Sequence, residues 1–219
     1  MLMFISVDGG DGVGKTTLVE KLAAYYDLYY LKKPIDTFLC VKEPNDIRHR
    51  ISKLVQKIVY EVNKSEKLKV AFNSSLLLHY KKQLEDEDVI VDRGMLSCYM
   101  FNGDETTEPT FDKYIKKGLE FDICFFLTAS PETRRERMLK RNPNDEDLKN
   151  GNLDKLTAGQ YKAIKYAESR GIPVAVIDTD GKNEEQVFEE ARQIMDMYLE
   201  LNPDARKKAP AKAETERGE

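Results

Sequence analysis

The sequence has 219 residues, of which 41% are apolar, and this length and composition fit one α/β domain with a single core. It carries 35 basic and 39 acidic residues, so its net charge of −4 gives no global attraction for nucleic acid polymers or anionic membranes. No apolar run reaches the length of a membrane span, and we expect a soluble, unexported protein. The three cysteines form no C-x-x-C pair, which favours the reducing cytoplasm.

Short apolar runs alternate along the chain with longer segments of helical periodicity. The apolar runs span residues 4–7, 38–41, 89–91, 123–127 and 174–177. The helical segments span residues 17–26, 47–62, 67–85, 111–117, 131–141, 156–170 and 184–201. Five such repeats predict a three-layer α/β/α fold with a five-stranded parallel sheet, whose ligands bind beyond the carboxyl ends of the strands.

Polar segments without periodicity interrupt this pattern at residues 102–109 and 142–154, and both read as surface loops. We expect one domain over residues 1–201, with a lid near residues 134–154. Residues 202–219 are rich in Ala, Lys, Glu and Pro and have almost nothing to bury, so we predict a disordered, solubilising tail.

A phosphate-binding loop is the most specific motif in the chain. Residues 9–16 read G-G-D-G-V-G-K-T, which matches G-x-x-x-x-G-K-[ST], and the loop lies between the first apolar run and a helical segment. In that context main-chain N–H groups and a helix N-terminus point at the phosphates. The predicted nucleotide-binding residues are Gly9, Gly10, Asp11, Gly12, Val13, Gly14, Lys15, Thr16 and Thr17.

A carboxylate follows the third apolar run, where residues 89–93 read V-I-V-D-R. Asp92 is therefore placed like a Walker-B aspartate, and Thr16 offers a hydroxyl, so we predict that these two residues bind Mg²⁺. An aspartate at a strand end is also a common helix N-cap, but its pairing with the phosphate-binding loop favours the metal role.

A basic segment follows the fourth run, where residues 132–141 read E-T-R-R-E-R-M-L-K-R. Helical spacing places Arg134, Arg137 and Arg141 along one face, and guanidinium groups suit phosphate oxygens. The simpler interpretation is a solvated helix face laced by ion pairs. The position of the segment before an aperiodic loop favours a mobile lid over the nucleotide.

Together these motifs resemble the thymidylate kinase group of nucleoside monophosphate kinases over residues 4–199. The family's opening motif corresponds to F-I-S-V-D-G-G-D-G-V-G-K-T-T, with Asp8 where Glu is more usual. Because Gly12 rather than Arg stands inside the loop, the chain is similar to bacterial-type enzymes whose catalytic arginines come from the lid. The lid motif is matched by Ser130, Pro131 and Glu132 followed by Arg137 and Arg141.

The resemblance implies roles for further residues. The catalytic set that it implies is Asp11, Lys15, Arg93, Arg137 and Arg141, with Arg134 contacting the donor nucleotide. The acceptor-binding set that it implies is Asp8, Lys42, Glu43, Arg48, Phe72, Arg93, Ser97, Phe101 and Asn102. The resemblance also implies a homodimer.

One departure concerns the acceptor base. The family's F-A-A-D-R-x-x-H segment reads F-N-S-S-L-L-L-H here, so Leu76 replaces the base-contacting arginine. Discrimination between bases rests on paired polar groups, so this change weakens strict selectivity for thymine. Phe72 either stacks on the base or is a core aromatic, and His79 lies on a mostly apolar helix face where a structural role is more common.

We therefore expect an ATP- and Mg²⁺-dependent kinase that phosphorylates a deoxynucleoside monophosphate, dTMP or a relative such as dUMP. A deoxynucleoside kinase is the first alternative, with Asp8 or Glu43 as the base, although Lys42 and Arg48 favour an acceptor that already carries phosphate. A GTPase-type switch is the second. Its D-x-x-G match at residues 178–181 follows the last strand, and N-K-S-E at residues 63–66 lacks the aspartate that reads guanine.

Overall fold

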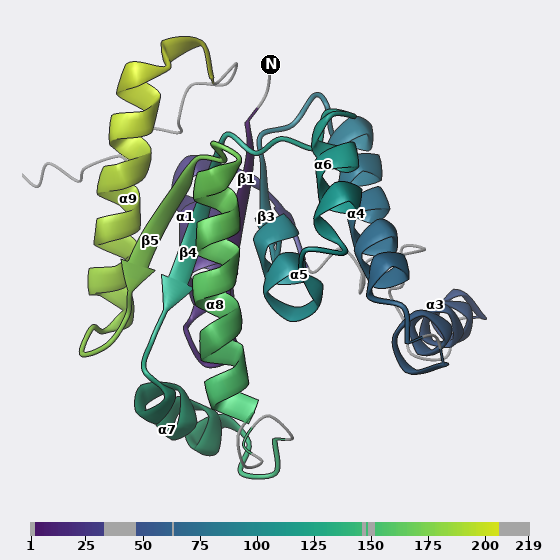
Figure 1. Cartoon of the computed structure of the whole chain (residues 1–219). Helices are drawn as coiled ribbons and strands as arrows, with labels where there is room; N and C mark the ends of the chain where they lie inside the picture. The colour runs from purple at the N-terminus through teal and green to yellow at the C-terminus, as the bar shows by residue number, and fades with distance from the viewer. Residues whose placement is uncertain (1–2, 33–46, 63, 146–147, 149–151, 206–219) are drawn as a thin grey trace, which may run out of the picture.

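The computed structural model describes residues 3–32, 47–62, 64–145, 148 and 152–205. Its centre is a sheet of five parallel strands in the order β2-β3-β1-β4-β5 (Figure 1). The strands are β1 (Phe4–Gly9), β2 (Tyr29–Leu31), β3 (Val89–Asp92), β4 (Ile123–Thr128) and β5 (Val174–Asp178). The predicted parallel α/β fold is confirmed, and β1 lies in the middle of the sheet.

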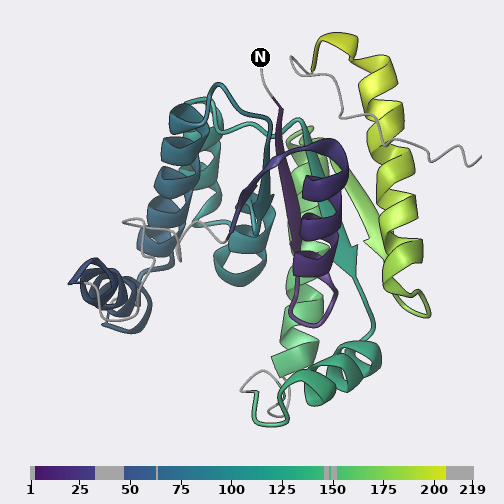
Figure 2. The ribbon, with the colours of Figure 1, turned by 180° about the vertical axis from the view of Figure 1, so that it is seen from behind.

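Helices cover both faces of the sheet. They are α1 (Lys15–Tyr26), α3 (Ile47–Lys57), α4 (Glu66–Gln83), α5 (Met95–Asn102), α6 (Glu108–Ile115), α7 (Pro131–Arg141), α8 (Asn152–Ser169) and α9 (Glu184–Leu201). A π-helical turn, Ile58–Val62, extends α3, and a short 3-10 helix, Pro203–Ala205, follows α9. Helices α4, α5 and α8 lie on the face seen in Figure 1, and α1 and α9 lie on the face seen in Figure 2.

The alternation of side chains along the strands builds two cores, because successive residues of a strand point to opposite faces. The core under α1 and α9 takes from the sheet Ile5, Val7, Phe125, Leu127 and Ile177. The core under α4, α5 and α8 takes from it Phe4, Val89, Val91, Cys124 and Phe126. On β1 the buried polar residues Ser6 and Asp8 share the parity of Phe4, so they point toward α5, where the main-chain N–H of Ser97 reaches Asp8.

Two elements differ from the sequence-based expectation. The second strand of the described sheet is Tyr29–Leu31, and the predicted run at residues 38–41 lies outside the described residues. Among the described residues, strand β2 pairs with β3 alone, and its first residue, Tyr29, is half-exposed, so no continuous apolar run is needed. Helix α5 was not predicted either, because residues 95–100 are all buried and give no amphipathic period.

The ends of several predicted segments also shift. The predicted loop at residues 102–109 begins on the last residue of α5 and reaches into α6, and α8 begins inside the loop predicted at residues 142–154. The one-domain boundary at residue 201 and the lid stay predictions, and residues 206–219 of the tail lie outside the described residues. In the part of the chain that the structure describes, no helix is long and apolar enough to cross a membrane.

Candidate active site

The phosphate-binding loop connects the end of β1 to α1 at the carboxyl edge of the sheet. Its turns use positive φ angles at Gly9 (131°), Gly12 (82°) and Gly14 (93°), which glycine adopts without strain. A Cβ atom on Gly9 would lie 2.4 Å from the main-chain oxygen of Leu127, so a side chain at this position would collide with β4. The loop is thus folded against the sheet and leads into the N-terminus of α1, an arrangement that suits an anion.

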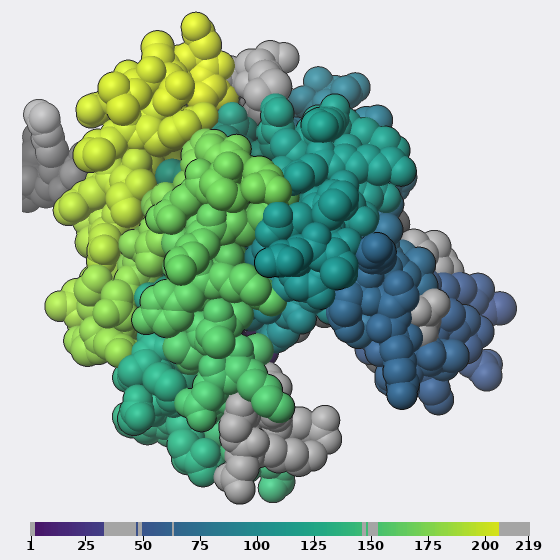
Figure 3. All heavy atoms as spheres, viewed as in Figure 1, coloured from purple at the N-terminus to yellow at the C-terminus, as the bar shows by residue number. Residues whose placement is uncertain are grey.

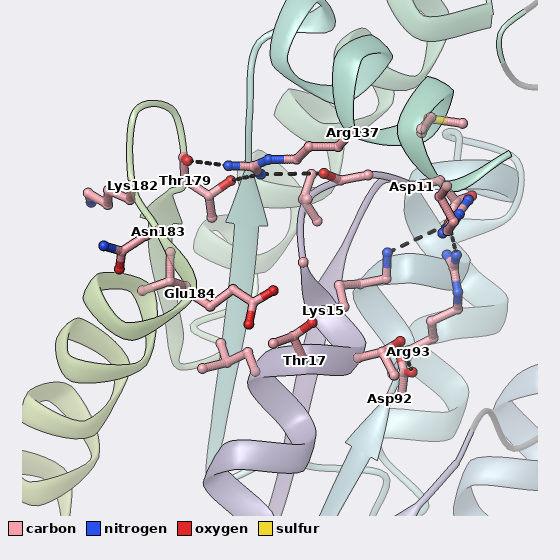
Figure 4. Close-up of a pocket in the computed structure, with 18 residues that line it drawn as sticks. Asp11, Lys15, Thr17, Asp92, Arg93, Arg137, Thr179, Lys182, Asn183 and Glu184 are labelled. Carbon is pink, nitrogen blue, oxygen red and sulfur yellow. Dashed lines mark hydrogen bonds and ion pairs between the residues drawn. The ribbon is translucent and has the colours of Figure 1, made fainter. Parts of the chain in front are cut away.

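A cavity of about 680 Å³ opens in front of this loop (Figure 4). It is bounded by the loop and the start of α1, by the end of β3, by α7, and by the segment that joins β5 to α9. Its lining includes eleven predicted site residues, namely Asp11, Gly12, Val13, Gly14, Lys15, Thr16, Thr17, Asp92, Arg93, Arg137 and Arg141. A cavity of this size accommodates a nucleotide.

Lys15 lies at the floor of the cavity and is only 6% exposed. Its Nζ donates to the main-chain oxygen of Gly10 over 2.5 Å and lies 3.8 Å from the Asp11 carboxylate. Burial lowers the pKa of the Lys15 ammonium to about 7, and the positive charge of Arg93 acts in the same direction. Lys15 is therefore partly neutral near pH 7 until an anion binds.

This depressed pKa predicts that nucleotide binding takes up a proton. Bound phosphates favour the charged ammonium and raise the pKa of Lys15, so above pH 7 binding must protonate it. We expect uptake of close to one proton per ADP at pH 8, measured by calorimetry in two buffers of different ionisation enthalpy, and affinity that falls as the pH rises from 7 to 9.

The control is Lys21→Met on the same helix, because Lys21 pairs with Glu185 outside the cavity and its loss should leave proton uptake unchanged. Binding of ADP at pH 8 without proton uptake would contradict the prediction.

Asp11 joins the two predicted catalytic cations. Its Oδ1 forms an ion pair with the Arg93 guanidinium and is also the oxygen that lies nearest the Lys15 ammonium (Figure 4). Arg93 follows β3 in a left-handed conformation, with a φ of 73°, and its guanidinium lies 5.7 Å from the centre of the Phe101 ring. The strained backbone of Arg93 directs its side chain across the sheet edge toward the loop. The arrangement places two positive charges around one carboxylate beside the cavity.

Thr16 and Asp92 are in direct contact, as the predicted magnesium site requires. The Thr16 hydroxyl donates to Asp92 Oδ2 over 2.9 Å, and the Tyr30 hydroxyl lies 3.4 Å from the same oxygen. Asp92 is buried, and its Oδ1 has no hydrogen-bond partner among the described residues. A buried carboxylate oxygen beside a hydroxyl fits Mg²⁺, which uses few protein ligands and completes its shell with water and phosphate oxygens.

Two arginines of α7, Arg137 and Arg141, differ in how firmly they are held. Arg137 donates from Nη1 to the Thr179 hydroxyl over 2.9 Å and from Nη2 to the Thr179 main-chain oxygen over 2.8 Å, while Nη1 also lies 3.4 Å from the Gly12 oxygen (Figure 4). Arg141 is largely exposed and pairs with Asp145 at 2.9 Å. Both line the cavity, but Arg137 alone is fixed between the loop and the segment after β5.

Arg134 lies outside the lining of the cavity, so its predicted contact with the nucleotide stays a prediction. Its side chain is fully buried, and its Nε donates to the main-chain oxygen of Asp11 over 2.8 Å. The helical spacing placed the three arginines on one face correctly, but the N-terminal part of that face lies beneath the loop. Gly9 and Gly10 also lie outside the lining and shape the loop from behind.

Asp8, which was predicted to bind the acceptor, is held inside the protein by hydrogen bonds, and its contact with an acceptor stays a prediction. It is fully buried in β1, where Oδ2 accepts from the Ser6 hydroxyl and Oδ1 from the Ser97 main-chain N–H, both over 2.6 Å. Burial raises the pKa of Asp8 above its ordinary value, although these hydrogen bonds oppose the shift. Asp8 thus anchors the start of α5 to the sheet.

Five of the other predicted acceptor residues lie on α3, α4 and α5. Phe101 is half-exposed beside Arg93, Ser97 is buried, and Asn102 donates to the Cys98 main-chain oxygen over 3.2 Å. Phe72 is partly buried on α4. None of these four lines the cavity of the loop. Lys42 and Glu43 lie outside the described residues, and so does the side chain of Arg48 on α3.

The structure adds residues that the motif analysis did not select. The far wall of the cavity consists of Thr179, Lys182, Asn183, Glu184 and Val187. They follow β5, and the rule that ligands bind beyond the carboxyl ends of parallel strands already pointed to Thr179. The D-x-x-G match at residues 178–181 thus has a structural meaning, because its threonine holds Arg137.

Comparisons with known proteins identify the family of the chain. The thymidylate kinase family model matches residues 7–191. A probable thymidylate kinase of Methanocaldococcus jannaschii is 26% identical over 191 residues, which cover 86% of this chain and 93% of that protein. A thymidylate kinase of Mycoplasmopsis agalactiae is 30% identical over 111 residues, 46% of this chain and 49% of that protein.

Solved structures share the fold. A deoxyadenosine kinase from M. mycoides, with the products dCMP and a flexible dCDP bound, aligns with a TM-score of 0.59 at 17% identity, over 88% of this chain and 98% of that one. The same enzyme with bound dATP aligns with a TM-score of 0.57 at 20% identity and equal coverage. With a phosphate-binding loop, a Thr16–Asp92 pair and a family match over most of its length, the chain belongs to the thymidylate kinase family of nucleoside monophosphate kinases.

Proposed function

We propose that the protein transfers the γ-phosphoryl group of ATP to the 5′-phosphate of thymidine monophosphate. The observation that carries this proposal is the Asp11–Arg93 pair at the edge of the loop cavity, in a chain of this family. Phosphoryl transfer needs little covalent help from the protein, which works by positioning and by neutralising charge. The cations Lys15, Arg93 and Arg137 surround the cavity and suit that task.

Each of these groups has a separate role in the proposed reaction. The loop N–H groups and Lys15 hold the donor phosphates, and Lys15 exchanges its contact with the Gly10 oxygen for a phosphate oxygen. Thr16 and Asp92 would hold Mg²⁺, which neutralises charge on the donor phosphates when bound. Arg137, already fixed by Thr179, offers its guanidinium to the phosphoryl group in transfer.

The acceptor separates this proposal from a deoxynucleoside kinase. Phosphorylation of a 5′-hydroxyl needs a carboxylate base in reach of that oxygen. Asp8 is fully buried and both its oxygens already accept hydrogen bonds, so it does not serve as that base. This observation removes one of the two candidate bases, while the other, Glu43, lies outside the described residues, so the assay below decides between the two acceptors.

An ADP-release assay with ATP and Mg²⁺ over all nucleosides and nucleoside monophosphates tests the proposal. We expect turnover with dTMP, slower turnover with dUMP, and none with thymidine. The Asp8→Asn variant is the matched control, because it keeps the size of the side chain and an oxygen that accepts from the Ser97 N–H, and it removes the only described carboxylate that was a candidate base. Activity confined to unphosphorylated nucleosides would establish the nucleoside kinase instead, and GTP hydrolysis without acceptor would establish a switch.

We infer that the protein is a homodimer in the cytoplasm. Helix α3 and its π-helical turn stand out from the body (Figure 3) and expose an apolar stripe of Ile47, Ile51, Leu54, Ile58 and Val62. The first four are spaced by four, three and four residues, which is the spacing of helices that pair. Such a stripe on a surface marks an interaction site, and two copies would cover each other's. Cys98 and Cys124 are buried thiols, as suits a reducing compartment.

Replacing Leu54 with lysine is expected to convert the dimer to a monomer at micromolar concentration, because the charge would fall in the middle of the stripe. Sedimentation velocity measures the change. The control is Lys53→Ala on the same helix, which lies beside the stripe and should leave the dimer intact. A wild-type protein that sediments as a monomer would contradict the inference and leave the kinase proposal untouched.

A further inference from the structure

Arg134 lies beneath the phosphate-binding loop and connects it to two helices. The side chain comes from α7 and is 0% exposed. Its Nε donates to the main-chain oxygen of Asp11 over 2.8 Å, and its Nη1 lies 3.5 Å from the Thr157 hydroxyl of α8. One guanidinium thus joins the loop, the first helix after β4 and the helix that follows it, from outside the cavity.

The loop has the shape that this guanidinium requires. A Cβ atom on Gly10 would lie 2.8 Å from Arg134 Nη2 and 2.9 Å from the amide nitrogen of Gln160, a buried residue of α8. A Cβ atom on Gly12 would lie 3.0 Å from the main-chain oxygen of Arg134. Because both positions are glycines, the loop packs directly against polar groups of α7 and α8, those of Arg134 and Gln160.

The bond from Arg134 acts on the residue that organises the catalytic cations. The main-chain oxygen of Asp11 accepts from Arg134, while the Asp11 carboxylate pairs with Arg93 and faces Lys15. A shift of the Asp11 main chain would move both contacts at once. We propose that Arg134 is a positioning residue, which fixes Asp11 from below and thereby sets the loop, Lys15 and Arg93 for phosphate binding.

The chemistry of the position explains why it holds arginine. A guanidinium keeps its charge when buried and offers several donors in a rigid fork, so it can bond the loop and Thr157 together. A lysine has a single ammonium at its end and loses its proton more readily on burial. The charge of Arg134 also adds to the positive end of α1, which favours an anion in the cavity. The inference rests on the proposed function only in taking the cavity to bind the donor nucleotide.

The test compares Arg134→Met and Arg134→Lys with the control Arg135→Met, an exposed neighbour on α7 that bonds only the Leu148 oxygen, at 3.4 Å, among the described contacts. The readouts are ADP affinity by calorimetry, kcat and KM for ATP, and the melting temperature. We expect Arg134→Met to bind ADP about tenfold to a hundredfold more weakly, as loss of a buried charged hydrogen bond implies, at temperatures where it is folded. Arg135→Met should match the wild type.

A merely structural role would lower the melting temperature and leave the ADP affinity of the folded variant unchanged, and that result would overturn the proposal. If Arg134→Met does not fold, Arg134→Lys decides, because it keeps the charge and most of the volume. Weaker ADP binding by the folded lysine variant supports the proposal, and wild-type affinity overturns it. Failure of the proposed function is seen separately, as a wild-type protein that binds ADP and phosphorylates no nucleoside monophosphate.

Discussion

Replacing Lys15 with alanine is expected to lower kcat by about a thousandfold while the fold stays intact. Lys15 is the buried cation of the loop, and its amine contacts only polar groups, the Gly10 oxygen and the Asp11 carboxylate, among the described contacts. The alanine variant lacks the ammonium charge that stabilises the phosphates in the transition state. It loses no apolar contact of the Lys15 amine. ADP release at saturating ATP and dTMP measures the effect, and circular dichroism checks the fold.

The control for this variant is Lys21→Ala, because Lys21 lies on the same helix and pairs with Glu185 away from the cavity. It should keep wild-type turnover. An alanine variant of Lys15 with near wild-type turnover would refute the role of Lys15 and, with it, the assignment of the loop as the phosphate site.

Replacing Arg137 with alanine is expected to lower kcat about 100- to 1000-fold with little change in ADP affinity. The guanidinium is held by three acceptors, two on Thr179 and one on Gly12, so it is in place before substrate binds and needs no reorganisation during the reaction. The kcat of Arg141→Ala should fall less, because Arg141 is exposed and pairs with Asp145 instead of contacting the loop. Steady-state kinetics with a parallel ADP titration separates the two effects.

Arg135→Ala is the control on the same helix, since Arg135 is exposed and outside the cavity. An Arg137 variant with unchanged kcat and weaker ATP binding would assign the residue to the donor nucleotide rather than to the transferred group. That outcome would also remove the lid from the proposed mechanism.

The strand-loop-helix order around the loop and the proximity of Thr16 and Asp92 could be predicted because their signals are local. A strand, a glycine-rich turn and a helix follow one another in residues 4–26, and Asp92 directly ends a buried strand. The contact between Thr16 and Asp92, 76 positions apart, then follows from β3 lying next to β1. Fold class and loop chemistry need no information beyond these neighbours.

Features that depend on tertiary position could not be predicted in the same way. Helical spacing places Arg134 and Arg137 on one face of α7. It does not predict that Arg134 lies beneath the loop while Arg137 lines the cavity. The role of Asp8 as an anchor for α5 could not be predicted for the same reason. Its burial depends on α5, and that helix has no amphipathic period in the sequence. Strand β2 was missed because an edge strand with exposed tyrosine carries no apolar run.

The exposed stripe of α3 would make subunit association part of the folding of this region in the proposed dimer. Helices of about 12–15 residues or fewer are marginal in water without tertiary packing, and α3 has 11 residues before its π-helical turn. Its apolar side chains on the stripe meet solvent in the single chain, so in the proposed dimer that side of the helix would gain stability from the second copy. The order of α3 would then vary with protein concentration, and a dilute kinase would differ from a concentrated one in local structure as well as in mass.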